Sequence, residues 1–216
     1  MQFDISALPA SDAYRLLASV VVPRPIALVT TTGPDEQINA APFSFFNMVG
    51  SDPPVVALGI TDRAPGSPKD TRANLVRTGC FVVNLVDEDL AEAMNICGID
   101  FPQGESEMDA AGLTSTPSVA VSAPRIAESP VQLECRLAQV VSLGGNRIVL
   151  GEVVFLHIRD EFVDTEKRRV HTDALHLIGR MHGGGWYART SDLFDMPRIP
   201  YAQWQAQHPD APAGAS

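Results

Sequence analysis

Cysteine is scarce in this sequence of 216 residues, which contains three, Cys80, Cys97 and Cys135. Their number is odd and no two form a C-x-x-C pair, which argues against a disulfide framework and against a zinc site. Such cysteine usage is typical of a reducing compartment, so we expect a cytoplasmic protein. Cys97 is expected to be a small buried apolar side chain, because no basic residue lies near it in the sequence to activate a thiolate.

Long hydrophobic runs are also lacking. The apolar stretch from Leu16 to Val22 ends at Pro23-Arg24-Pro25 and is too short to span a bilayer. The N-terminal stretch MQFDISALPASD contains no basic residue of the kind that opens a signal peptide. The sequence therefore indicates neither export nor membrane anchoring.

Positive charge is in short supply, since 16 Lys and Arg stand against 26 Asp and Glu and give a net charge of -10. Nucleic acids and anionic membranes are polyanions, so neither is an expected partner. Between Arg77 and Arg125 there is no basic residue, and the acidic residues from Asp87 to Asp109 are expected to form a solvated face. Just upstream, four basic residues are accompanied by Asp70 and favour a small anion: Arg63, Lys69, Arg72 and Arg77.

Several common catalytic and cofactor motifs are absent from the sequence. No G-x-G-x-x-G pattern follows a strand, so nothing supports a Rossmann fold. His171 and His176 are five residues apart and would not share a helix face as paired metal ligands usually do. We therefore expect no metal site.

Short β-branched runs are what the sequence has in abundance, and its hydrophobic fraction of 45% is enough for a sizeable core. Strands are expected at residues 24–31, 38–44, 53–60, 80–86, 132–143 and 147–158, and helices at 12–19, 69–77 and 87–97. Many strands with hairpin-like links predict a mainly β fold, an antiparallel barrel with a few short helices. We expect one domain over residues 1–200 and a partly disordered tail over 201–216, frayed from His208 onward.

Local signals mark the ends of the helices and the faces of one strand. Ser11 or Asp12 is expected to cap the first helix, and Gly79 and Gly98 are expected to close the other two. Along residues 132–143 apolar and polar side chains alternate, so Leu133, Cys135, Leu137 and Val141 are expected on one face, and Glu134 and Arg136 on the other.

The stretch GSPKDTRANL places Ser67, Lys69 and Thr71 in the loop and first turn of an expected helix. Free backbone N–H groups and the helix dipole favour a negative ligand there, and a phosphate monoester fits this chemistry. The alternative is an ordinary helix start, in which Ser67 or Thr71 is the cap and Lys69 lies in solvent.

The stretch INAAPFSFFN, residues 38–47, has almost no polar groups besides its backbone, Ser44 and Asn47. A flat heterocycle needs apolar neighbours for its faces and backbone groups for its polar edge, and this stretch offers both. The alternative is a barrel strand that buries its three Phe side chains.

Five segments in this order carry a family resemblance: RPIALVTT, NAAPFSFFN, DPPVVALGI, KDTRANL and IGRMHGGGWYART. From about Tyr14 to Thr190 the chain resembles the flavin reductase-like proteins of the FMN-binding split-barrel class, above all their flavoredoxin-type members. The resemblance implies a Greek-key split β-barrel, a homodimer and FMN held near the subunit interface.

The resemblance also implies which residues hold FMN. Expected near the ring and ribityl chain are Arg24, Pro25, Thr30, Asn39, Ala41, Pro42, Ser44, Phe45, Phe46 and Asn47. Expected at the phosphate are Arg63, Ser67, Lys69, Asp70 and Thr71. Arg180, His182 and Tyr187 are expected in a loop near the flavin or its nicotinamide partner, although Gly183 to Gly185 could equally form only a turn.

The implied function is an FMN-dependent reductase that takes a hydride from NAD(P)H and passes electrons to free flavin or another small acceptor. No catalytic acid or base is needed for this step, because positioning carries most of the catalysis. Two other interpretations stay open: an FMN-binding electron carrier reduced by a partner protein, and a binding module for heme or another planar ligand.

Overall fold

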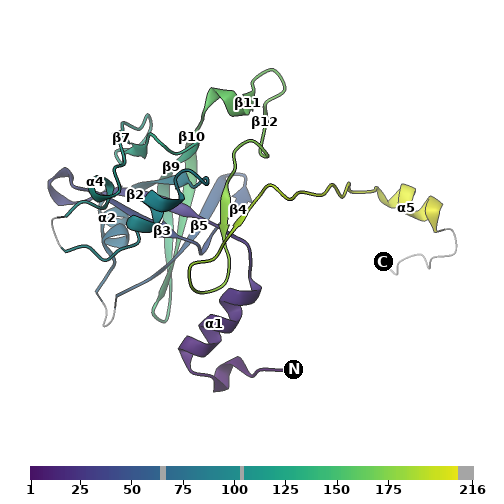
Figure 1. Cartoon of the computed structure of the whole chain (residues 1–216), viewed down its shortest axis with the longest axis horizontal. Coiled ribbons are helices and arrows are strands. Elements are labelled where there is room, and N and C mark those ends of the chain that lie inside the picture. The colour runs from purple at the N-terminus through teal and green to yellow at the C-terminus, as the bar shows by residue number, and fades with distance from the viewer. Residues whose placement is uncertain (64–66, 103–104, 209–216) are drawn as a thin grey trace.

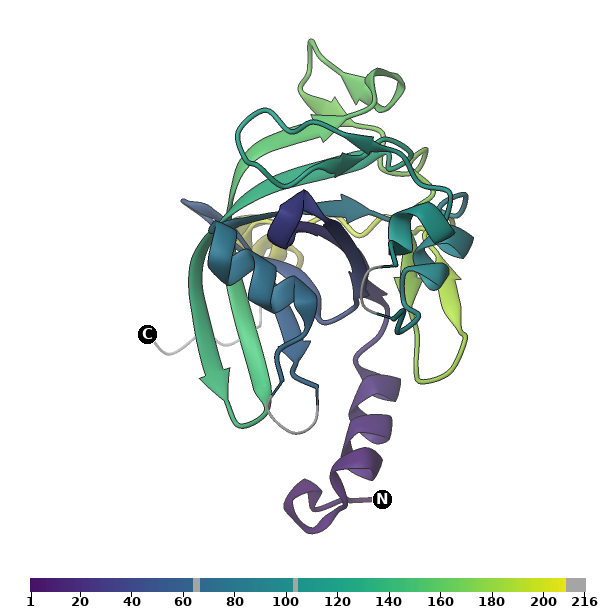
Figure 2. The same ribbon diagram turned by 90° about the vertical axis from the view of Figure 1, so that its left-hand side faces the viewer.

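A computed structural model of the chain describes residues 1–63, 67–102 and 105–208. Its main sheet is built from β2 (Ala27–Thr32), β3 (Ile38–Phe43), β4 (Phe46–Ser51), β5 (Pro54–Thr61), β6 (Cys80–Leu85), β9 (Val131–Leu143) and β10 (Asn146–Ile158). These strands lie in the order β3-β2-β6-β9-β10-β5-β4, and all neighbours are antiparallel. The sheet is strongly curved, as Figure 2 shows.

The sheet closes because its two outermost strands, β3 and β4, follow each other directly in the chain. Only Ser44 and Phe45 separate them, so the two sheet edges must lie within about 10 Å of each other where the strands meet. The carbonyl oxygen of Phe45 accepts a hydrogen bond from the N–H of Gly59 in β5, at 2.7 Å. Because β5 and β6 pack on opposite sides of the β9–β10 hairpin, the strand order is that of a Greek key, and the expected split barrel is confirmed.

Two apolar cores follow from this closure. Inside the barrel, Leu58, Phe81 and Val83 are fully buried. A Cβ atom at Gly151 of β10 would lie 2.8 Å from Cε1 of Phe81, so glycine there makes room for the aromatic ring. On the outer side of β2, a second core packs Leu28 against Met94 and Met108.

Short helices cover one side of the barrel (Figure 1): α2 (Asp70–Thr78), α3 (Ala91–Ile96) and α4 (Glu107–Ala110). Helix α1 (Ala10–Val20) projects from the body, and α5 (Tyr201–Gln207) ends an extended C-terminal segment. None of the helices in the described ranges is long and apolar enough to cross a membrane.

Smaller elements complete the fold. Their bounds are η1 (Ile5–Ala7), η2 (Pro34–Glu36) and η3 (Asp160–Phe162) for the 3-10 helices, and β1 (Arg24–Pro25), β7 (Ser115–Thr116), β8 (Arg125–Ile126), β11 (Val163–Asp164), β12 (Arg169–Val170), β13 (Ile178–Arg180) and β14 (Tyr187–Arg189) for the strands. Strands β1, β13 and β14 form a small sheet of their own, so the expected strand at 24–31 divides between two sheets.

The helix predictions were partly wrong. Neither Ser11 nor Asp12 caps α1, because that helix begins earlier, after Pro9. The expected helix at 87–97 is also shorter, because Asp87 forms a bridge to Leu177 and helical geometry starts at Ala91. The end of α2 was predicted correctly, since Gly79 adopts a left-handed conformation with φ 72°.

The C-terminal segment was expected to be partly disordered over residues 201–216. Helix α5 occupies the first seven of these positions, and most of its side chains are exposed. The expected fraying from His208 onward falls on residues 209–216, outside the described residues, except for His208 itself.

Glu134 lies on the polar face of β9 yet is fully buried. The backbone N–H groups of Val119 and Ala120 donate to its two oxygens, at 2.8 and 2.6 Å, and Nε2 of His157 lies 2.6 Å from Oε1. Burial by itself would raise the pKa of this carboxyl, but these partners stabilise the charged form and lower the pKa below 4.5. Glu134 therefore ties the loop around Ala120 to the barrel.

Replacing Glu134 by Gln should lower the free energy of unfolding near neutral pH by roughly 1 to 3 kcal/mol, because an amide cannot accept hydrogen bonds at both positions. The folded-state pKa is lowered, so the carboxylate's contribution is complete above the unfolded-state pKa of about 4.3. It is lost as pH falls through the folded-state value. Urea unfolding should show the difference between Glu134→Gln and wild type shrinking on acidification. Glu152→Gln, exposed on the same hairpin, is the control; equal losses for both variants would contradict this role.

Candidate functional site

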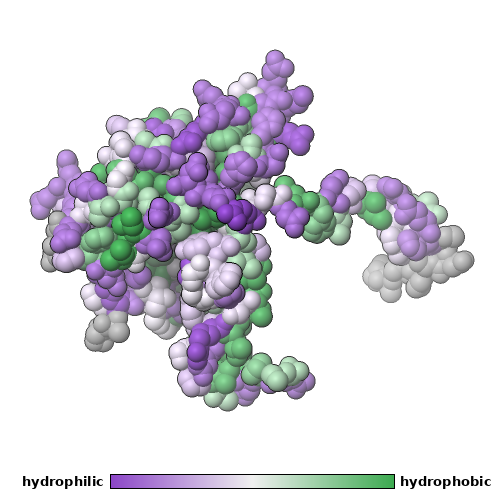
Figure 3. Space-filling model, in the orientation of Figure 1, coloured by the Kyte–Doolittle hydropathy of each residue, from purple (hydrophilic) through white to green (hydrophobic). Residues whose placement is uncertain are grey.

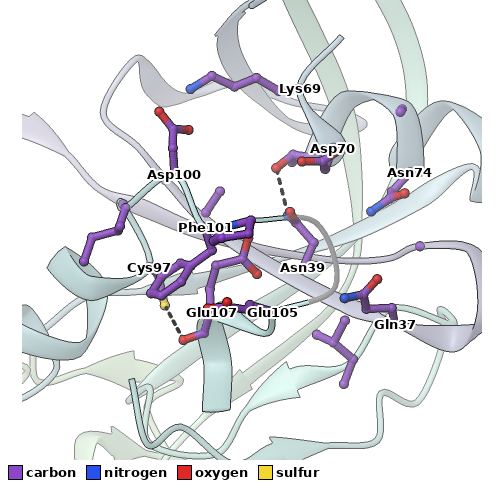
Figure 4. A pocket seen from close by; sticks show the side chains of 18 of the residues that line it. Gln37, Asn39, Lys69, Asp70, Asn74, Cys97, Asp100, Phe101, Glu105 and Glu107 are labelled. Atoms are coloured by element: carbon purple, nitrogen blue, oxygen red, sulfur yellow. Dashed lines mark hydrogen bonds between the residues drawn. The ribbon is translucent and has the colours of Figure 1, made fainter. Parts of the chain in front are cut away.

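A cavity of about 570 Å³ lies between the outer edge of β3, the start of α2 and the segment around α4. Strand β3 is an edge strand of the main sheet, and its residues Ile38, Asn39, Ala41 and Pro42 line this cavity. Figure 4 shows Asn39, Lys69, Asp70 and Phe101 converging on it. The cavity thus brings together the two stretches, INAAPFSFFN and GSPKDTRANL, that the sequence singled out.

One end of the cavity suits an anion. Lys69 is the N-cap residue of α2, and no side chain caps this helix start. Among the described residues, the N–H groups of Asp70, Thr71 and Arg72 have no hydrogen-bond acceptor. Free N–H groups at a helix start attract negative charge, and the Lys69 ammonium adds to this. Neither Ser67 nor Thr71 is the N-cap that the alternative interpretation expected. Ser67 lies before the N-cap residue, in a β-bridge with Arg63, and Thr71 is buried and accepts a hydrogen bond from Asn39.

The acidic lining of the cavity is largely compensated. Asp70 and Asp100 lie 3.1 and 3.9 Å from the Arg63 guanidinium. Burial raises the pKa of the Glu107 carboxyl, which favours its neutral form. The end of the acidic run therefore also lines the cavity. Asp100 and Glu105 are exposed, as expected of a solvated face, whereas Glu107 is half-buried and Asp87 is buried, so the prediction was wrong for these two.

The expected basic cluster is also divided by the fold. Arg72 forms an ion pair of 2.7 Å with Asp62, and Arg77 donates to the carbonyl of Thr32 at 2.6 Å. Nζ of Lys69 lies over the Phe43 ring, 5.8 Å from its centroid. Of the four basic residues, Lys69 is therefore the one that lines the cavity and has no carboxylate or carbonyl partner among the described residues.

The middle of the cavity is suited to a flat polar heterocycle. Ala41 and Pro42 supply a small apolar wall, and Phe101 adds an aromatic ring to the lining. Nδ2 of Asn39 donates to Oγ1 of Thr71 at 3.0 Å, which fixes the amide between the wall and the helix start. Apolar faces with a few fixed polar groups are what a bound ring requires.

Of the predicted site residues, seven line this cavity: Asn39, Ala41, Pro42, Arg63, Lys69, Asp70 and Thr71. Ser67 lies next to it in a β-bridge with Arg63. Thr30 does not line it, because its buried hydroxyl donates to the carbonyl of Pro124.

Three further predicted residues, Pro25, Phe46 and Asn47, line a second cavity, here called the apolar groove. Its volume is about 410 Å³, and it lies between β4, β10 and β13. Met48 and Leu156 are exposed at its margin. The INAAPFSFFN stretch therefore passes from one cavity to the other as it turns the corner at Ser44.

Arg24 is a structural clamp in this molecule. Its guanidinium is buried and donates to the carbonyls of Ala18, Val21 and Met181, at 2.7, 2.8 and 2.7 Å. It also lies 5.8 Å from the ring centroid of Phe45. Arg24 therefore joins α1, β1 and the end of β13 behind the barrel corner, and its side-chain donors are used by the protein itself.

The loop after β13 is exposed. Arg180 stacks on Tyr187 at 4.7 Å, and the ring of His182 lies 5.8 Å from that of Trp186. Neither Arg180 nor His182 lines the cavity beside β3. Within the described ranges, no group of three or more His, Cys, Asp or Glu side chains is arranged to hold a metal ion.

The sequence reasoning missed several lining residues. Gln37 and Asn74 contribute amides to the cavity, and Phe101 contributes an aromatic wall. Asn74 lies within α2, four residues after Asp70 and three after Thr71. This spacing places the three residues on one helix face and could have identified Asn74. Phe101 lies in a segment whose position against β3 is a tertiary contact, so no local signal marks it.

Comparison with known proteins gives this cavity its context. The family described as the flavin reductase like domain matches residues 19–181. The chain belongs to the flavin reductase like family. An uncharacterized protein of Deinococcus radiodurans is 49% identical over 210 residues, which cover 95% of this chain and 92% of that protein.

Solved structures show the same family resemblance. The 2-nitrobenzoate 2-nitroreductase of Pseudomonas fluorescens is 38% identical, with a TM-score of 0.85 over 93% of this chain and 98% of that one. Nitrilotriacetate monooxygenase component B from Bacillus cereus is 31% identical, with a TM-score of 0.86 over 91% and 98%. A Shewanella frigidimarina protein named for its split barrel domain, 24% identical with a TM-score of 0.79 over 92% of this chain and 100% of that one, shows the fold.

Two thiols of this flavin reductase like protein, those of Cys97 and Cys135, should be inert. The three cysteines are free and buried. Burial, with Glu107 nearby, raises the pKa of Cys97 from 9.0 to about 12, and burial raises that of Cys135 to about 12. The thiolate fraction below pH 9 then falls about a thousandfold, so alkylation of native Cys97 by iodoacetamide should slow by at least that factor. Peptide mass spectrometry should find both sites modified rapidly only in urea; fast native labelling of Cys97 would contradict its burial.

Proposed function

We propose that this protein is an FMN-dependent oxidoreductase that uses NAD(P)H as hydride donor and passes electrons to free flavin or another small acceptor. Membership in the flavin reductase like family supports flavin-related oxidoreduction in general. The observation that carries the finer proposal is the cavity beside β3, where an uncapped helix start with Lys69 lies next to the apolar wall of Ala41 and Pro42.

The residues present fit FMN. Its phosphate would lie at the start of α2, where Lys69 and the N–H groups of Asp70 and Thr71 offer donors to a dianion. Its ring would lie against Ala41 and Pro42. When bound, FMN supplies the hydride and electron chemistry, and the protein needs no acid or base of its own for it.

The chain's own residues would position the reactants and exclude water. Arg63 pairs with Asp70 and also lies near Asp100, so it would reduce the repulsion between these carboxylates and the phosphate. The hydrogen bond from Asn39 to Thr71 fixes β3 against α2, which holds the two ends of the cavity at constant separation.

A small acceptor is supported by the relative that is 38% identical, which is named for the reduction of 2-nitrobenzoate. The alternative function is an electron carrier whose FMN is reduced by a partner protein. A heme-binding module is disfavoured, because the described lining of the cavity includes no His, Met or Tyr side chain and its one cysteine, Cys97, is buried.

We also propose that the protein is a homodimer. Large apolar side chains are exposed on β4 and β10, the two strands that flank β5 in the main sheet: Met48, Val49, Phe155 and Leu156. Met48 and Leu156 line the same groove, and an exposed apolar patch is typical of a subunit interface. The patch borders the apolar groove, where Pro25, Phe46 and Asn47 lie, so a second subunit would cover these predicted site residues.

Lys69→Ala should weaken FMN binding far more than riboflavin binding, because FMN alone carries the phosphate that pairs with the ammonium. The expected loss for FMN is about 1.5 to 3 kcal/mol. Lys167→Ala is the matched control, since Lys167 is the chain's other lysine and lies in the turn between β11 and β12. Titration calorimetry measures the affinity for both ligands. Equal weakening of FMN and riboflavin binding would show that Lys69 supports the fold and does not bind the phosphate.

Anaerobic NADH or NADPH should bleach the yellow protein–FMN complex, and oxygen or free flavin should restore the colour. Stopped-flow absorbance measures both steps and the preference between the two nicotinamides. Binding of FMN without bleaching by either nicotinamide would overturn the reductase function and favour the electron carrier. Failure to bind FMN would overturn both.

A further inference from the structure

The C-terminal arm, residues 191–207, leaves the body of the molecule after β14 (Figure 1). Apart from Trp204, which is half-buried, all of its residues are exposed. In the part of the chain that the structure describes, its backbone hydrogen bonds stay within α5 and its two ends. No backbone hydrogen bond within the described ranges therefore ties the arm to the body of its own subunit.

The arm is rich in large apolar side chains despite this exposure. Phe194 and Met196 are 83% and 78% exposed, and Leu193, Ile199 and Tyr201 are exposed as well. Figure 3 shows hydrophobic residues distributed along it among polar ones. An exposed segment with so much apolar surface is expected to bind another surface.

The backbone of the arm is suited to reach a neighbouring molecule. Residues 191–200 have no regular secondary structure, and Pro197 and Pro200 favour extended conformations before them. Ten extended residues span roughly 33 Å. The radius of gyration of a domain of this size is about 17 Å, so the arm is long enough to extend well onto the surface of a second subunit.

The apolar groove offers a matching surface. It is lined almost entirely by apolar side chains, and Met48, 61% exposed, lies at its margin beside the proposed dimer patch. Phe194 is 83% exposed, Tyr201 is 60% exposed and Trp204 is half-buried, so burying these three side chains would remove on the order of 400 Å² from water per arm. Two symmetric arms would double this, which is about two thirds of the roughly 1,200 Å² of a stable interface before the patch itself is counted.

We infer that the C-terminal arm of one subunit docks in the apolar groove of a second copy of this chain, so that two arms clasp the dimer reciprocally. This inference rests on the proposed homodimer. It goes beyond it, because the arm of one subunit then covers Pro25, Phe46 and Asn47 of the other. The arm of one subunit would thereby lie next to predicted site residues of the other subunit, which are otherwise open to solvent.

Complementation between two variants separates docking on a second copy from docking on the same subunit. Phe194→Asp damages the arm, and Met48→Asp damages the groove. Each variant alone should raise the dissociation constant of the dimer at least about tenfold in sedimentation experiments. A mixture of the two should form a heterodimer more tightly than either variant forms a homodimer, since one intact arm then meets one intact groove. Lys167→Ala, in the turn between β11 and β12 and outside both the arm and the groove, should leave the constant unchanged.

Trp204 provides a second readout. In a Trp186→Phe background it is the chain's one tryptophan, and its emission should shift to the blue as protein concentration rises through the dimer dissociation constant. A blue-shifted emission independent of concentration, or no rescue in the mixture, would overturn docking on a second copy. A wild-type protein that is monomeric at every concentration would overturn the homodimer as well. FMN binding is measured separately in the same samples, so failure of the dimer can be told apart from failure of the proposed FMN function.

Discussion

The corner at Ser44 and Phe45 is the constraint on which the rest of this structure depends. Strands β3 and β4 are the two edges of the main sheet, and two residues join them, so the sheet must curl until its edges meet. The hydrogen bond from Gly59 to Phe45 and the stacking of Arg24 on the Phe45 ring hold the corner in place. Strand β3 then presents its free edge to α2 and α4, which creates the cavity.

Charge is distributed in this acidic protein so that the cavity can still accept an anion. Arg63 is shared between Asp70 and Asp100, and burial disfavours the charged form of Glu107. Among the described residues, no acceptor pairs with Lys69 or with the first N–H groups of α2, so the electrostatic potential at this helix start is positive. A net charge of -10 therefore does not describe the field at the start of this helix.

The two cavities differ in kind, and the same stretch of chain connects them. Polar and charged groups surround the cavity beside β3, whereas apolar side chains form the groove beside β4. An apolar groove open to water is costly, and so is an exposed apolar arm. Both costs are removed together if the arm of each subunit covers the groove of the other. Dimer assembly would then also affect the predicted site residues in the groove, Pro25, Phe46 and Asn47.

The sequence by itself determined the strand-rich class, most strand positions and the Gly79 helix end. These are local signals, because β-branched runs and glycine act over a few residues. Only the tertiary structure decided that Asp100 and Glu107 line the cavity, that Arg24 is consumed as a clamp and that Glu134 is buried and charged. Each of these depends on contacts between segments distant in sequence, and burial or an ion pair at such a contact overrides what the residue type alone would suggest.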